Sequence, residues 1–261
     1  ENPSQAGNGK FLLIGNDDGA MDDWYDYTET DVPDSSENIE RVKKEWRVDK
    51  QGGDIGTIDL SMEEAQMPAK EFGYPTYVLM VDTNDGDFTD CNTFYELADN
   101  GDGYFKAEDV SFDKGDYFTI GLVKPTVQFQ DTTYSAFEPD ESGTATATLN
   151  FIPGQSYQVD YTSIEGTATA GSDYTSMSET LTFSQGNRTV DITVDITDDT
   201  EPESNEEFFL ELQNPQSGLE IGEDTTTTFV IQDDDNDRKI YFPNIDSTRD
   251  EGAISTVDIK V

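Results

Sequence analysis

The clearest pattern along the chain is the alternation of apolar and polar residues between positions 125 and 236. Turns rich in Gly, Pro, Asn and Asp separate the alternating segments. A two-residue period places every second side chain on one face, which predicts β-strands with one buried face. About seven such strands in roughly 110 residues indicate an antiparallel two-sheet β-sandwich. The alternating segments are 127–129, 157–161, 181–183, 190–196, 208–212 and 229–231.

Residues 1–124 alternate less regularly and are predicted to form a separate, mainly β domain. The long segment 16–40 is acidic and poor in aliphatic residues, so it is interpreted as a loop, and Pro125 marks the joint. Single helical turns are predicted within 62–71 and 92–98. The predicted strands are 11–14, 42–48, 55–60, 77–81 and 117–122.

The end of the chain repeats the start of the sandwich. The segment 127–129 is followed by Glu138, and the segment 240–242 is followed by Glu251 in the same register. Both offsets are 113 residues, because 240 − 127 and 251 − 138 give the same value. The sequence therefore predicts that residues 237–261 are the truncated first strands of a second sandwich, within an array of neighbouring domains.

Composition narrows the class of partner. The 57 acidic residues against 15 basic ones give a net charge of −42. This charge excludes nucleic acid and anionic membrane surfaces as partners, and it suits divalent cations or a strongly solvated exterior. Cys91 is the only cysteine, so no intrachain disulfide forms. No apolar run approaches the roughly 20 residues of a membrane span, so no direct membrane insertion is expected.

Catalysis has little support in the sequence. The chain has no histidine, which excludes histidine-dependent triads and histidine-ligated zinc. A two-carboxylate glycosidase is compatible with the composition, but no pair stands out among the acids. We therefore predict that the chain is not an enzyme.

Acidic residues gather beside the ends of the alternating segments. Calcium takes six to eight oxygen ligands from carboxylates, carbonyls and water. Loops at one end of a sandwich lie together and can supply such ligands from distant chain positions. The alternative is a solvated acidic face that binds no ion. The candidate ligands are Glu138, Asp173, Asp198, Asp199, Glu203, Glu206, Asp233, Asp234 and Asp235.

The segment 125–236 resembles the Calx-beta domain, the sandwich that senses calcium in sodium–calcium exchangers and recurs in bacterial surface adhesins. The resemblance rests on Phe129 followed by Glu138, on GTATAGSDY at 166–174, on LTF at 181–183, on DD at 198–199 continuing to EEF at 206–208, and on IQDDD at 231–235. It implies an immunoglobulin-like sandwich that binds Ca²⁺ through all nine acids named above. It adds the carbonyl of Glu201 as a further ligand.

The first domain has Asp-rich turns of its own. Read from Asp82 as a calcium loop of the EF-hand type, glycine falls at the fifth position and Thr93 at the twelfth, which excludes that motif. Two interpretations stay open, namely ordinary turns and an irregular calcium site. The residues concerned are Asp82, Asn84, Asp85, Asp87, Asp99 and Asp102.

The first domain contains the motifs WRV at 46–48, GDIG at 53–56, LMVD at 79–82, GDF at 86–88 and GDYFT at 115–119. By these motifs it resembles uncharacterised β-rich modules in large secreted proteins of gliding and marine bacteria. Trp24, Tyr25 and Tyr27 lie in its polar loop and suggest either a glycan-binding platform or an aromatic loop that packs on its own sheet. We therefore expect an extracellular fragment of a large bacterial adhesin in which calcium stiffens the sandwich array. The alternatives are a carbohydrate- or surface-binding module at residues 1–124 and a non-catalytic part of a secreted hydrolase.

Overall fold

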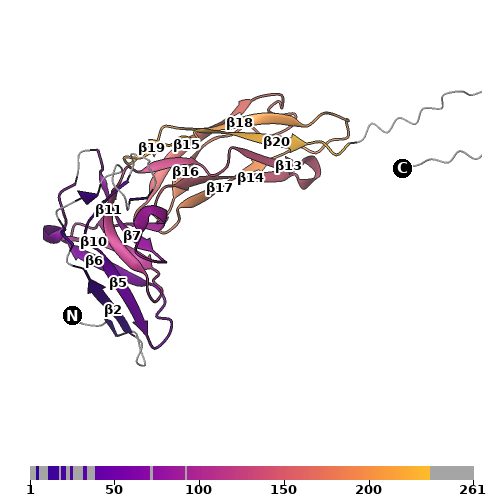
Figure 1. Ribbon diagram of the computed structural model, residues 1–261. Helices are drawn as coiled ribbons and strands as arrows, with labels where there is room; N and C mark the ends of the chain where they lie inside the picture. Colours follow the sequence, from indigo (N-terminus) through magenta and orange to yellow (C-terminus); the bar gives the residue numbers. More distant parts are fainter. Residues whose placement is uncertain are drawn as a thin grey trace, which may run out of the picture.

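The protein is almost entirely β-structure, arranged as two domains joined end to end (Figure 1). A computed structural model describes residues 4–5, 11–17, 19–21, 24–25, 32–33, 39–70, 73–91 and 93–235. The predicted second repeat at 237–261 and the aromatic residue Tyr27 lie outside these described residues. The predicted all-β class is confirmed.

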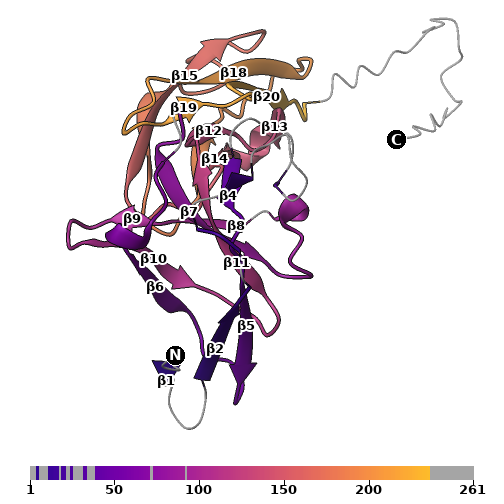
Figure 2. The same cartoon turned by 60° about the vertical axis from the view of Figure 1, so that its left-hand side comes forward.

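Two sheets build the first domain (Figure 2). Apolar side chains of the larger sheet, including Leu79, Phe118 and Ile120, pack with Phe105 and Val110 of the smaller one. The larger, eight-stranded sheet contains β1 (Ser4–Gln5), β2 (Phe11–Asn16), β3 (Trp24–Tyr25), β4 (Ile39–Val42), β5 (Trp46–Gln51), β7 (Thr76–Asp82), β8 (Thr93–Glu96) and β11 (Tyr117–Val123). The smaller sheet contains β6 (Ile58–Glu63), β9 (Ala98–Asp99) and β10 (Tyr104–Val110).

The predicted strand at 42–48 is wrong, because the chain breaks there into β4 and β5. Both strands pair with β11, at different positions along it. The buried Arg41 pairs with Glu45 at 2.9 Å, which closes the connection between them. The hydroxyl of Thr119 donates to the carbonyls of Val42 and Lys44 at 3.2 and 2.7 Å. These bonds satisfy backbone groups that a continuous strand would have used for pairing.

The helical turn predicted within 92–98 is also wrong. The described part forms β8, which pairs with β7, and β9. Phe94 and Glu96 are buried while Thr93 and Tyr95 are half-buried, which is the two-residue period of a strand. The turn predicted within 62–71 is present as the short 3-10 helix η1 (Glu64–Gln66), and a second, η2 (Phe88–Asp90), follows β7.

The second domain is the predicted two-sheet sandwich. Its core contains large aromatic side chains from both sheets, among them Phe129, Phe183, Phe208 and Phe229. One sheet has the order β17 (Thr189–Asp195), β14 (Ser142–Leu149), β12 (Thr126–Phe129) and β19 (Glu220–Ile221). The other has the order β13 (Thr133–Phe137), β20 (Thr226–Gln232), β18 (Glu206–Gln213), β15 (Tyr157–Glu165) and β16 (Ser178–Phe183).

The expectation of purely antiparallel sheets needs one correction. Strand β12 pairs with β19, and β13 pairs with β20, in the parallel sense. The chain after Phe129 crosses from one sheet to the other, so the strands on the two sides of this crossing run in the same direction. Since β13 runs parallel to β20, the segments that follow the two strands leave the sandwich together at the same end.

Candidate metal centre

Four chain segments meet at the end of the sandwich that lies away from residues 1–124 (Figure 1). The short helix η3 (Glu138–Asp140) follows β13, and residues 233–235 follow the neighbouring β20. The connection between β17 and β18 carries the acids of 198–203, and the connection between β15 and β16 carries Asp173. Phe137 pairs with Gln232, so Glu138 and the aspartate triplet start from adjacent positions.

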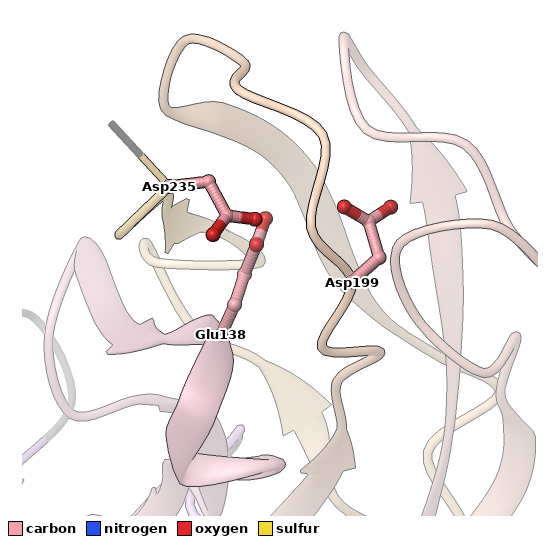
Figure 3. Close-up of side chains that lie close together, drawn as sticks. All are labelled: Glu138, Asp199 and Asp235. Atoms are coloured by element: carbon pink, nitrogen blue, oxygen red, sulfur yellow. The ribbon is translucent and has the colours of Figure 1, made fainter. Parts of the chain in front are cut away.

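Glu138 is the centre of the first acidic cluster. Ligand atoms of Glu138, Asp199 and Asp235 all lie within 4.8 Å of one another, and the same holds for Glu138, Asp198 and Asp234. Figure 3 shows the carboxylates of Glu138 and Asp235 facing each other, with Asp199 on the neighbouring loop. A single buried carboxylate therefore connects two groups of acids.

A second cluster lies on the adjoining loops. Ligand atoms of Asp173, Glu203 and Glu206 also fall within 4.8 Å of one another. The amide of Thr169 donates to the side chain of Asp173 at 2.6 Å, and the amide of Thr197 donates to the Asp173 carbonyl at 2.9 Å. These bonds fix Asp173 between two loops.

Backbone bonds within the loops also position the remaining acids. The amide of Glu201 donates to Asp199 at 2.8 Å, and the amide of Glu203 donates to Asp233 at 3.1 Å. Asp233 thereby links residues 233–235 to the loop before β18. The side chains of Glu201 and Asp233 lie in neither cluster. The two backbone hydrogen bonds just described connect these residues to the site. Sequence reasoning missed Glu165, which accepts from the amide of Ala170 at 3.1 Å and supports the loop that carries Asp173.

The first cluster contains carboxylate oxygens without hydrogen-bond partners. Glu138 is 6% exposed. Its Oε2 and the Oδ2 of Asp235 are both buried, and neither atom receives a hydrogen bond. Burial, together with the charges of Asp233 and Asp199, raises the pKa of Glu138 to about 7. A buried anion with unused lone pairs is costly unless a cation or a proton neutralises it.

Carboxylates of the second cluster also have raised pKa values. Burial and a hydrogen bond with Asp173 raise the pKa of Glu206 to about 7. The pKa values of Glu203 and Asp235 are raised as well, first by burial and then by neighbouring acids. Arg188 is the only basic residue in the sequence 125–235, and it directly precedes β17. The strand β17 runs from there toward the acidic end, so no base of this segment neutralises the two clusters.

The Asp-rich turns of the first domain look different. The buried carboxylate of Asp82 accepts from the amides of Asn84, Asp85 and Gly86. Asp99 accepts from Gly101, and Asp102 from Tyr104, in the same local manner. Asp85 and Asp87 accept from amides two residues further along. These side chains shape turns, and within the described part of the chain they form no cluster like those of the second domain.

Comparisons with known proteins separate the two domains in the same way. Residues 123–235 match the Calx-beta domain family, and residues 1–116 match a family described as a domain of unknown function (DUF8202). A curated relative, Adhesion G-protein coupled receptor V1 of Danio rerio, is 40% identical over 78 residues, which are 30% of this chain and 1% of that protein. The chain therefore spans a very small part of this relative.

Solved structures of Calx domains also align with this chain. The CBD12 structure from CALX1.2 is 25% identical, with a TM-score of 0.41, and the alignment covers 42% of this chain and 46% of that one. The apo-form Calx CBD1 domain is 26% identical, with a TM-score of 0.40 over 42% of this chain and 98% of that one. None of the described helices is both long and apolar enough to span a bilayer. From the family match, residues 123–235 of this chain are a Calx-beta domain.

Proposed function

We propose that the acidic end of the Calx-beta domain binds calcium, with Glu138 as the shared ligand of the first cluster. The observation that carries this proposal is the buried Glu138 carboxylate, whose Oε2 has no hydrogen-bond partner and lies among four other acids. Hard carboxylate oxygens from several loops form the ligand set that calcium prefers, and the set contains no nitrogen or sulfur donor that would favour a softer metal.

The residues assigned to binding fall into three groups by their placement. Glu138, Asp198, Asp199, Asp234 and Asp235 form the first cluster, and Asp173, Glu203 and Glu206 form the second. Asp233 and the carbonyl of Glu201 complete the proposed set, because the loop bonds described above keep both beside the clusters. Calcium at these positions would offset the repulsion among the acids and hold four loops together.

The role that follows is structural. A metal that ties residues 233–235 to η3 and to the loop before β18 stiffens the point at which the chain leaves the sandwich. We propose that the chain is part of an extracellular adhesin-like protein, of bacterial type, in which this stiffening keeps the domain array extended, and that it acts as a binding module without catalysis. In a longer piece of the parent protein that includes the proposed following domain, equal maximum dimensions in small-angle scattering with calcium and with chelator would exclude the stiffening.

A calorimetric titration of the full chain with calcium tests the binding. We expect saturable heat for the wild-type chain. The double variant Asp199→Ala/Glu203→Ala removes one ligand from each cluster and is expected to weaken binding at least tenfold, about 1.4 kcal/mol. The matched control is Asp131→Ala/Glu223→Ala, which removes the same charge from exposed positions outside both clusters. Equal affinities for both double variants, or no heat for the wild type, would refute the assignment.

A further inference from the structure

At the opposite end of the Calx-beta domain, strand β8 of the first domain forms backbone hydrogen bonds with the second domain. Tyr95 forms a parallel bridge with Ile152 of the second domain. The amide of Ile152 donates to the carbonyl of Phe94 at 2.6 Å, and the amide of Glu96 donates to the carbonyl of Ile152 at 2.8 Å. The two domains thus share backbone hydrogen bonds of the kind that join strands within one sheet.

Glu96 places a buried carboxylate against the second domain. It is 4% exposed, and its two oxygens accept from the amide of Gly154 at 2.8 Å, the side chain of Gln155 at 2.9 Å and the hydroxyl of Tyr157 at 2.8 Å. All three donors belong to the Calx-beta domain. Each bond to a charged acceptor is stronger than a neutral one and fixes direction as well as distance.

The packing around Glu96 is equally close. A Cβ atom added at Gly154 would lie 2.9 Å from the Cβ of Ala98 and 3.3 Å from the Glu96 carbonyl, so only glycine permits this approach. Met80 and Phe94 of the first domain belong to the same buried apolar cluster as Phe151 and Tyr157 of the second. Separating the domains would therefore expose apolar surface as well as the Glu96 carboxylate.

We propose that this end of the Calx-beta sandwich is a docking surface for a strand that carries a carboxylate, and that Glu96 fixes the first domain on it in one orientation. The surface consists of residues 151–157, which supply three hydrogen-bond donors and the apolar side chains of Phe151 and Tyr157. The two domains then move as one rigid unit, and this holds with or without calcium. The inference does not depend on the proposed metal centre, which lies at the other end of the sandwich.

Distance measurement between two spin labels on the full chain tests the proposal. Glu63→Cys and Thr193→Cys introduce exposed labelling sites, one in each domain. Burial raises the pKa of the Cys91 thiol to about 12, so the native cysteine is expected to stay unlabelled. We expect one narrow distance distribution, unchanged between calcium and chelator.

Substitutions then separate the role of Glu96 from general packing. Glu96→Ala removes the acceptor of three hydrogen bonds between the domains, and it is expected to broaden the distribution at least twofold. Tyr157→Phe removes one donor and should broaden it less. The matched control is Glu108→Ala, because Glu108 also accepts from the second domain, through Gln185, but its side chain is 38% exposed. The proposal is overturned by a wild-type distribution that is already broad, or by a Tyr157→Phe or Glu96→Ala chain that is folded by circular dichroism and as narrow as the control.

Discussion

Replacing Glu138 by glutamine is expected to stabilise the chelated protein and to destabilise the calcium-loaded one. Without a cation, the folded chain holds Glu138 with a pKa of about 7, against an ordinary value of 4.5. A raised pKa means that the folded state binds the proton more tightly than the unfolded state does. The stability of the chelated wild type therefore falls as pH rises from about 5 to 8, and Glu138→Gln removes this loss.

The size of the effect follows from the shift. A pKa difference of about 2.5 units corresponds to about 3 kcal/mol at pH 8, as an upper value because the glutamine amide also needs partners. With calcium at 1,000 times its Kd, binding adds about 4.1 kcal/mol to the wild type. The variant lacks most of this stabilisation, which exceeds the roughly 3 kcal/mol that it gains, so it is the less stable of the two proteins in calcium. Urea unfolding at pH 8, with EDTA and with calcium, measures both signs.

The matched control is Asp131→Asn, which removes an exposed charge outside both clusters. We expect it to change the free energy of unfolding by less than about 0.5 kcal/mol in either condition. A Glu138→Gln variant that is destabilised in EDTA would contradict the account, because it would mean that the carboxylate has a protein partner in the folded state.

Replacing Phe208 by alanine is expected to cost about 3–5 kcal/mol of folding free energy, the usual range for a large aromatic residue removed from a core. Phe208 is fully buried, and its ring stacks on Tyr174 at 3.9 Å and on Phe229 at 5.3 Å. Tyr174 directly follows Asp173, and Phe208 lies two residues after Glu206. The same substitution should therefore weaken calcium binding, since it loosens two elements of the second cluster.

Phe209 provides the control for this prediction. It is the next residue on β18 and is only half-buried on the opposite face. Phe209→Ala is expected to cost less than half as much, in urea unfolding with EDTA, and to leave calcium affinity unchanged. Equal costs for the two variants would show that the ring stack is not what holds the second cluster.

The sequence predicted the second domain well because its buried residues alternate with polar ones. The segments 190–196 and 208–212 carry large apolar side chains at every second position, so both the strands and their inward faces can be read directly. Strands β13 and β14 were not predicted. The side chains that β14 buries include the small Ala145 and Ala147, which contrast little with the threonines beside them. The parallel pairings depend on the crossing between sheets, which no local pattern encodes.

The acidic residues of the candidate site were all found in the sequence, since they occur in short runs at strand ends. Their division into two clusters, and the position of Glu138 between two groups of acids, required the structure. In the first domain, the strand break near Glu45 depends on the buried Arg41. The segment near Glu96 was predicted as a helical turn, but it forms the short strand β8. The role of Glu96 could not be predicted from the sequence, because its hydrogen-bond donors, Gly154, Gln155 and Tyr157, lie about 60 residues further along the chain.

The most direct test of the central claim is a crystal structure of the full chain grown with calcium. We expect ion density in contact with Glu138, between the carboxylates of Asp199 and Asp235 or of Asp198 and Asp234. We also expect a further ion bound by the second cluster, Asp173, Glu203 and Glu206. Oxygen–ion distances should be about 2.3–2.6 Å, as calcium requires. A well-ordered acidic end with no ion at Glu138, in crystals soaked at millimolar calcium, would contradict this claim.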